Sequence, residues 1–289
     1  MAILSIQSHV AYGYAGNTSA VFPLQRLGYE VWAVNTVEFS NHTGYGSWRG
    51  RALGGELVTE LVDGIAGRGV LSQCEAVLSG YLGEAGIALA VKQAVENVKK
   101  EAPDAVYCCD PVIGDYDRGV YVQDGILEMF REKLLPLAAI VTPNQFELGL
   151  LTGVDLSRPA GSKGALNAAL DAVHKSGPKT VLVTSLRRPR GGEIGMLVSE
   201  SGGIWEVSTP EFAFTQSIAG GGDLTAAVFL ARFLETKNAR LALEQTASSV
   251  FGIMEATYKS GQRELRTIAA QEELAAPSRH FTSKRFVAG

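Results

Sequence analysis

Three consecutive glycines and an aspartate stand directly before a strongly apolar segment. Gly220, Gly221, Gly222 and Asp223 precede residues 224–230, whose composition predicts the start of a buried helix. The glycines leave successive backbone N–H groups accessible, and a helix N-terminus carries partial positive charge, so the turn is typical of an anion site. An acid beside an anion site indicates a general base for a hydroxyl that attacks a phosphoryl group. A simple helix cap is the alternative role for Asp223.

Two further carboxylates follow apolar runs of the chain. Asp110 ends the run 105–109, and Glu147 closes the segment 142–147. A carboxylate at a strand end commonly faces the ligand crevice and can hold hydrated Mg²⁺. Asn144, three residues before Glu147, also fits a helix capping box, and the two roles are compatible.

Polar groups and aromatic rings are mixed in the loops after the first strands. Ser8 and His9 close the first apolar run, residues 39–46 follow the second, and Tyr81 follows the third. Such a mixture suits a flat heteroaromatic ligand, whose faces need apolar cover and whose edges need hydrogen bonds. Ordinary turns, with Asn17 as a helix N-cap after the first strand, fit the same residues.

The elements that would position these residues alternate between strands and helices. Segments with helical spacing, such as 86–100 and 124–134, lie between β-rich apolar runs at 3–6, 31–37, 76–78, 105–109, 139–142 and 180–184. The alternation predicts an α/β fold, with a mostly parallel central sheet flanked by helices on both faces. Later segments predict a β-hairpin and two helices, over 194–199 with 204–207, 224–235 and 239–258. No linker or repeat divides the chain, so we expect a single domain over 1–289.

The composition argues against several classes of protein. The 289 residues carry a formal net charge of −4, which disfavours nucleic-acid binding. Cysteine is rare, and Cys108 and Cys109 are adjacent within an apolar run, so a disulfide framework is not indicated. No run approaches the ~18 apolar residues that a membrane span needs. We therefore expect a cytoplasmic protein that does not bind membranes.

The set of motifs, taken in order, resembles the pyridoxal kinases of the ribokinase superfamily. The resemblance covers about residues 2–260 and rests on Gln7-Ser8-His9-Val10 with Tyr12-Gly13, Asn41-His42-Thr43, Ser79-Gly80-Tyr81-Leu82-Gly83, Asp110-Pro111-Val112-Ile113-Gly114, Thr142-Pro143-Asn144-Gln145-Phe146-Glu147 and Gly220-Gly221-Gly222-Asp223. It implies a ribokinase-like fold and a homodimer. It also implies transfer of the ATP γ-phosphate, with Mg²⁺, to the 5′-hydroxyl of pyridoxal, and of pyridoxine or pyridoxamine, in vitamin B6 salvage.

The resemblance also implies roles for individual residues. Asp223 would be the base beside the anion turn of Gly220, Gly221 and Gly222. Asp110 and Glu147 would organise Mg²⁺ through water. The pyridine ring would be surrounded by Ser8, Thr43, Gly44 and Tyr81. The nucleotide would be bound by Asp110, Thr142, Glu147, Thr184, Thr209, Pro210, Glu211 and Phe212.

The sequence departs from the superfamily pattern at two positions. Gly221 stands where Thr, Ala or Val is common, which leaves the amides accessible but costs backbone entropy. Thr184 stands where some members have Lys, and the nearest cations along the chain are Arg187 and Arg188.

Two other functions fit parts of the pattern. A hydroxymethylpyrimidine kinase of thiamine synthesis would have the same anion turn, so the loops at Ser8 and at 41–43 must discriminate. A protein that only binds B6 vitamers would need no base beside an anion site, and Asp223 argues against it.

Overall fold

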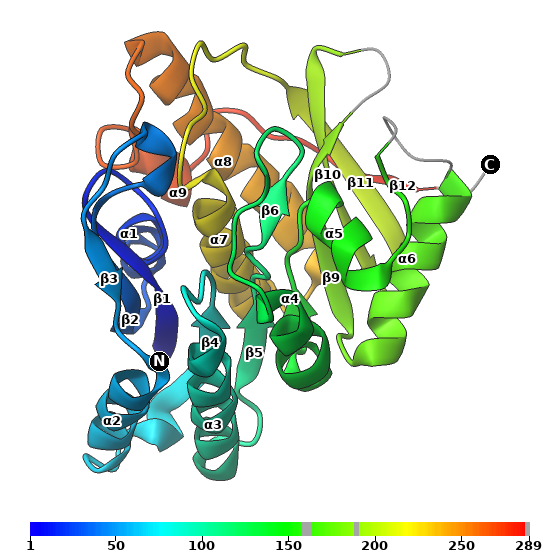
Figure 1. Cartoon of the computed structure of the whole chain (residues 1–289). Coiled ribbons are helices and arrows are strands. Elements are labelled where there is room, and N and C mark those ends of the chain that lie inside the picture. The colour runs from blue at the N-terminus through cyan, green and yellow to red at the C-terminus, as the bar shows by residue number, and fades with distance from the viewer. Residues whose placement is uncertain (158–162, 188–190, 287–289) are drawn as a thin grey trace.

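A ten-stranded sheet forms the centre of the molecule (Figure 1). The computed structural model describes residues 1–157, 163–187 and 191–286. Across the sheet the strands lie in the order β12 (Lys284–Arg285), β11 (Gly203–Pro210), β10 (Glu193–Glu200), β9 (Thr180–Arg187), β8 (Ile140–Val141), β5 (Val106–Cys109), β4 (Cys74–Ser79), β1 (Ala2–Tyr12), β2 (Glu30–Asn41) and β3 (Gly50–Ala52). The strands from β9 to β2 are parallel, whereas β3, β10, β11 and β12 pair antiparallel with their neighbours. The mostly parallel sheet and the hairpin of β10 with β11 are thus confirmed.

Helices cover both faces of the sheet, as predicted (Figure 1). One face is packed by α1 (Asn17–Arg26), α7 (Gly221–Thr236) and α8 (Ala239–Ser260). The other is packed by α2 (Gly55–Ala66), α3 (Ala85–Glu101), α4 (Ile126–Met129), α5 (Gln145–Thr152) and α6 (Lys163–Ser176). Successive residues of β1 face opposite sides, so Ile3 packs in one core and Leu4 and Ile6 in the other. Burial on both faces explains why apolar residues stand next to each other in this strand, as at Ile3 and Leu4.

The helix predicted over 124–134 is only partly present. It is divided into the short helix α4, a wider π turn over Phe130–Leu134 and a 3₁₀ turn over Leu135–Leu137. Pro136 lacks a backbone N–H and restricts the residue before it, so regular helix ends here. Phe130 is fully buried and fixes the segment against the core.

Asn17 does not cap α1, in contrast to that interpretation of the sequence. The N-cap is Gly16, at a φ of 53°, and Asn17 is the first helical residue, with 3% of its surface exposed. Its side chain accepts a hydrogen bond from Ser5 Oγ (2.7 Å) and donates to Asn35 Oδ1 (2.7 Å) and Val34 O (3.1 Å). These contacts fix the start of α1, and therefore the loop before it, to β1 and β2.

The carboxyl ends of the parallel strands carry the polar residues singled out in the sequence. Ser8 lies in β1, which continues to Tyr12 after an irregularity in its pairing with β2. Tyr81, Asp110 and Thr142 follow β4, β5 and β8. A small hairpin, β6 (Gly114–Asp115) with β7 (Gly119–Val120), follows β5 at the same edge. No helix in the described ranges is both long enough and apolar enough to cross a membrane.

Candidate active site

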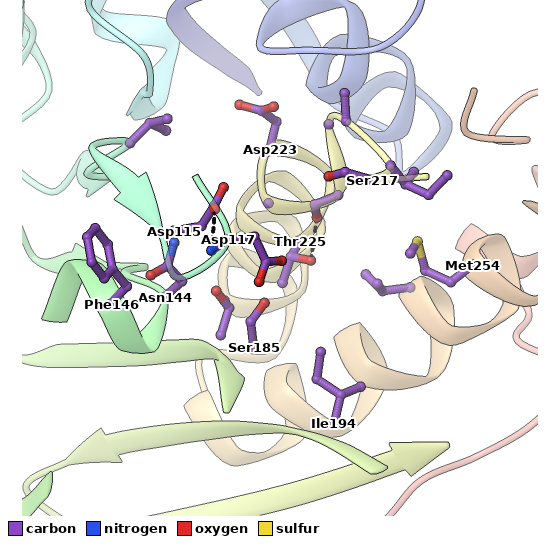
Figure 2. Close-up of a pocket in the computed structure, with 18 of the residues that line it drawn as sticks. Asp115, Asp117, Asn144, Phe146, Ser185, Ile194, Ser217, Asp223, Thr225 and Met254 are labelled. Carbon is purple, nitrogen blue, oxygen red and sulfur yellow. Dashed lines mark hydrogen bonds between the residues drawn. The ribbon is translucent and has the colours of Figure 1, made fainter. Parts of the chain in front are cut away.

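A cavity of about 480 Å³ opens at this edge of the sheet. All the site residues proposed from the sequence line it except Gly44, namely Ser8, Thr43, Tyr81, Asp110, Thr142, Glu147, Thr184, Thr209, Pro210, Glu211, Phe212, Gly220, Gly221, Gly222 and Asp223. Gly44 lies in the 3₁₀ turn η1 (Thr43–Tyr45), where its N–H donates to Nδ1 of His42 (3.1 Å). Figure 2 shows Asp223 at the start of a helix, with Asp115 and Asn144 on one side of the cavity and Met254 on the other.

The glycine turn is held closely against the loop between β1 and α1. Gly220 is the N-cap of α7 and has a φ of 79°, a conformation that L side chains rarely adopt. A Cβ added to Gly220 would lie 2.5 Å from Tyr14 O, and Ser19 Oγ donates a hydrogen bond to Gly220 O (2.7 Å). Gly221 and Gly222 begin the helix and have open space where a Cβ would be. Their amides have no acceptor within the helix, so they are suited to an anion in the cavity.

Asp223 lies in the first turn of α7 and is not its N-cap, which removes the simple cap as its role. The backbone N–H groups of Gly16 and of Asp223 itself lie beside its carboxylate. Burial raises the pKa of Asp223, and the two N–H donors oppose that rise. A carboxylate with a raised pKa is a stronger base than an ordinary aspartate, and here it faces the cavity next to the anion turn.

Asp110 and Glu147 add negative charge to the same cavity. Asp110 is 5% exposed, and its Oδ1 accepts a hydrogen bond from Thr142 Oγ1 (2.8 Å). Burial raises the pKa of Asp110 well above its usual value, and the charges of Glu147 and Asp223 raise it further. Three converging carboxylates favour a cation in the cavity, because a cation would offset both burial and mutual repulsion.

Glu147 completes the capping box expected at the start of α5. Asn144 Oδ1 accepts from Glu147 N (2.9 Å), and Glu147 Oε2 accepts from Asn144 N (2.9 Å). Its Oε1 accepts from the N–H groups of Ile113 (2.9 Å) and Gly114 (3.3 Å), which ties the loop after β5 to α5. Burial raises the pKa of Glu147 to about 7 despite these donors. Both oxygens are thus already hydrogen-bonded, which suits water-mediated contact with a metal ion better than direct ligation.

The carboxylates of the cavity fit a metal ion that binds together with the phosphates of a substrate. In the described ranges, no three His, Cys, Asp or Glu side chains are arranged to hold a metal ion by themselves. Mg²⁺ usually keeps several waters and binds through one or two carboxylates together with substrate phosphates. Asp110 and Glu147 match that mode.

Charged residues of the β6–β7 hairpin also line the cavity, although the sequence patterns did not single them out. Arg118 Nε donates to Asp115 Oδ2 (2.8 Å), and Arg187 Nη2, from the end of β9, donates to Asp117 Oδ1 (2.7 Å). Arg187 and Thr184 thus both line the cavity, whereas Arg188 lies outside the described residues. The sequence signal for this hairpin is the presence of three charged residues, Asp115, Asp117 and Arg118, among four consecutive positions.

Apolar residues of α8 form the opposite wall. Phe251 and Met254 line the cavity, and Phe212 stands next to them, with its ring centroid 5.3 Å from that of Phe251. The sequence did not identify Phe251 and Met254 as cavity residues. Residues that line a cavity and residues that pack in the core both lie on the apolar face of a helix, so helical spacing does not distinguish them.

Known proteins similar to this chain are described as kinases. A family model described as phosphomethylpyrimidine kinase matches residues 59–267. A protein named pyridoxal kinase PdxY from Granulibacter bethesdensis is 50% identical over 283 residues, which cover 97% of this chain and 98% of that protein. Its namesake from Rubrobacter xylanophilus is 52% identical over 286 residues, which cover 98% and 97%. The solved structure of pyridoxal kinase from Leishmania donovani with ADP and pyridoxamine has a TM-score of 0.88 at 31% identity and covers 99% of both chains.

The glycine turn generates a paired prediction on stability. Gly220→Ala should lower the free energy of unfolding by about 2–4 kcal/mol, because it combines a left-handed backbone with a clash against Tyr14 O. Gly221→Ala should be neutral or raise it by up to about 1 kcal/mol, since a methyl group fits there and the unfolded chain loses entropy. Denaturant unfolding of the two variants measures the difference. Equal effects would contradict the geometry described for the turn.

Proposed function

The chain belongs to the pyridoxal kinase family, and from this membership and the cavity we propose that it transfers the γ-phosphoryl group of ATP to the 5′-hydroxyl of pyridoxal. The products are pyridoxal 5′-phosphate and ADP, and pyridoxine and pyridoxamine are further acceptors. The observation that carries the proposal is the glycine turn at the start of α7 with Asp223 beside it. Relatives that share about half of the sequence are named for the same activity.

Asp223 and the glycine amides divide the chemistry between them. We assign Asp223 to accept the proton as the substrate oxygen bonds to the γ-phosphorus and the bond from that phosphorus to the β,γ-bridging oxygen of ATP breaks. Phosphoryl transfer depends mainly on positioning and on stabilising charge over the phosphoryl oxygens. The N–H groups of Gly221 and Gly222, at the positive end of α7, supply that stabilisation.

The vitamer site is assigned to the end of the cavity formed by the first strands. Ser8, Thr43 and Tyr81 surround the ring in this proposal, and Gly44 contributes through the conformation of η1 and not through the cavity wall. Burial and the nearby charges of Arg118 and Arg263 lower the pKa of His42 to about 4, so this ring is neutral at physiological pH.

The nucleotide is assigned to the other side, along β8, β9, β11 and α8. Thr142, Thr184 and residues 209–212 face it, with the rings of Phe212 and Phe251 as apolar cover. Asp110 and Glu147 would hold Mg²⁺ through water. When bound, that ion neutralises phosphate charge, and the excess of carboxylates in the cavity supports its place there.

A hydroxymethylpyrimidine kinase is the second candidate, and one observation favours it. The matched family model carries the description phosphomethylpyrimidine kinase. The match begins at residue 59, however, and leaves out Ser8 and Thr43. These residues lie in the loops that we expect to discriminate between pyridoxal and hydroxymethylpyrimidine. The named pyridoxal kinases match nearly the whole chain, including these loops. Mere vitamer binding is disfavoured, because it does not require a base at the anion turn.

We also propose that residues 1–289 act as one ribokinase-like domain. Strands from both ends of the chain, β1 and β12, belong to the same sheet, which supports a single folding unit. Homodimer formation and a cytoplasmic location stay predictions.

The acceptor is tested by incubating the protein with MgATP and either pyridoxal or hydroxymethylpyrimidine. We expect ADP and pyridoxal 5′-phosphate to form in equal amounts, with kcat/KM for pyridoxal well above that for the pyrimidine. Strong turnover of the pyrimidine without turnover of any B6 vitamer would reject the proposal in favour of the second candidate. Binding of pyridoxal without any ATP-dependent product would point to the vitamer-binding protein.

Replacement of Asp223 by Asn tests proton acceptance. The amide has nearly the shape of the carboxylate and keeps an oxygen that can lie beside the Gly16 N–H, and Asp223 is not the N-cap, so the melting temperature should change little. Loss of a general base should lower kcat by roughly 10²- to 10⁴-fold. Steady-state kinetics at saturating pyridoxal and MgATP measure the loss. A kcat near that of the parent protein would mean that another group takes the proton.

The isosteric variants Asp110→Asn and Glu147→Gln separate metal organisation from structural bracing. Asp110→Asn should raise the Mg²⁺ concentration for half-maximal rate by about tenfold, and stability should not fall because a repelling charge is removed. Glu147→Gln should also lower the free energy of unfolding by about 1–3 kcal/mol, since its NH₂ group would meet backbone N–H donors. An unchanged Mg²⁺ requirement in both variants would exclude them as metal organisers.

A further inference from the structure

The turn η1 is fastened to a segment that follows α8, 219 residues further along the chain. The hydroxyl of Tyr45 donates a hydrogen bond to Glu264 Oε1 (2.5 Å). The guanidinium of Arg263 stands over the Tyr45 ring, 3.6 Å from its centroid, and its Nη2 donates to Gly44 O (3.2 Å). Arg263, Glu264 and Tyr45 are called the clamp below.

The segment that carries the clamp is itself anchored in the core. Leu265 is 2% exposed and packs with Leu224 and Val228 of α7, and Thr267 is fully buried. The N–H of Arg266, two residues after Glu264, donates to Thr257 Oγ1 in α8 (3.0 Å). The clamp therefore connects η1 to the same helix, α7, that carries Asp223 at its start.

Glu264 also contacts the loop between β1 and α1. A Cβ added to Gly13, which has a φ of 90°, would overlap the Glu264 carboxylate. The acid therefore lies against the loop that follows Ser8 while it accepts the hydrogen bond from Tyr45. Two chain segments that line the vitamer end of the cavity thus share one carboxylate as a common support.

The turn η1 needs such support because it has little of its own. It contains three residues, and its internal bonds are Tyr45 N to His42 O (3.1 Å) and Gly44 N to His42 Nδ1 (3.1 Å). A 3₁₀ turn of this length is not stable alone, so external contacts set its conformation. Burial raises the pKa of Tyr45, and its hydrogen bond to Glu264 raises it further. The hydroxyl therefore remains a donor at neutral pH.

We propose that Arg263 and Glu264 are positioning residues for the vitamer, which hold Thr43 on η1 in its place at the cavity. The inference rests on the function proposed above and extends its site to a segment that does not line the cavity. A wall that is already ordered binds ligand more tightly, because less conformational freedom is lost on binding. The nucleotide lies against other elements, so loss of the clamp should weaken vitamer binding selectively.

Single substitutions in the clamp measure this effect. Tyr45→Phe removes the hydroxyl but keeps the ring under Arg263, and Glu264→Ala removes its acceptor. Each should raise KM for pyridoxal about tenfold, as expected for loss of a hydrogen bond to a charged group. KM for MgATP and the melting temperature should stay close to their parent values. Glu264→Gln, which keeps an acceptor oxygen, should restore most of the affinity.

Gln262→Ala is the matched control, because residue 262 is exposed, precedes the clamp directly and takes no part in it. The dissociation constant for pyridoxal without nucleotide is measured on all variants, so that binding is separated from turnover. A vitamer constant that does not change in Tyr45→Phe and Glu264→Ala overturns the proposal. So does a parallel rise in both KM values, which would show a general structural role.

The parent protein separates this inference from the function on which it rests. If it does not phosphorylate pyridoxal at all, the proposed function fails. If it does so and the clamp variants keep the parent KM, only the positioning role fails.

Discussion

The contact between the β1–α1 loop and the start of α7 is the constraint on which the rest of the site depends. Two segments about 200 residues apart meet there: Ser19 Oγ donates a hydrogen bond to Gly220 O, and the Gly16 N–H lies beside the Asp223 carboxylate and lowers its pKa. A side chain at Gly16 would overlap Ser8 O, and one at Gly220 would clash with Tyr14 O. Both glycines are therefore required by close backbone approach. Because of this approach, Asp223, the glycine turn and the β1–α1 loop are positioned together.

The electrostatics of the cavity favours a polyphosphate that binds together with a divalent cation. Asp110, Glu147 and Asp223 raise the free energy of the empty site, since burial and mutual repulsion disfavour their charged forms. A polyphosphate by itself would add to that repulsion, whereas a polyphosphate with a divalent cation reduces it. The backbone amides at the start of α7 are the complementary positive element. Their partial positive charge does not depend on pH, because backbone amides carry no titratable group. It therefore stays the same when a carboxylate of the cavity gains or loses a proton.

The end of the cavity that we assign to the vitamer is built from loops, whereas the side that we assign to the nucleotide is built mainly on strands and a long helix. Its loops are short and are supported by contacts from distant parts of the chain, among them Glu264 with Tyr45 and Arg263 with Gly44. This division agrees with what the two ligands would require of the protein. The phosphates require a rigid electrostatic frame, and the ring requires a close fit that exposed turns can provide only when other segments hold them.

The sequence by itself determined those features that depend on local patterns. The alternation of strands and helices, the β10–β11 hairpin, the capping box of Asn144 with Glu147 and the glycine turn before Asp223 all follow from short-range spacing. The sequence also indicated residues that line the cavity, because parallel strands bring their carboxyl ends to one edge of a sheet.

Only the tertiary structure decided which distant groups complete the site. Met254 resembles a core residue of an amphipathic helix, and Asn17 resembles a cap, although it joins α1 to β1 and β2. The Gly16 amide at Asp223 and Glu264 at Tyr45 leave no local signal either. The physical reason is that such contacts depend on how whole elements pack, and the spacing of residues along one element does not encode the position of another.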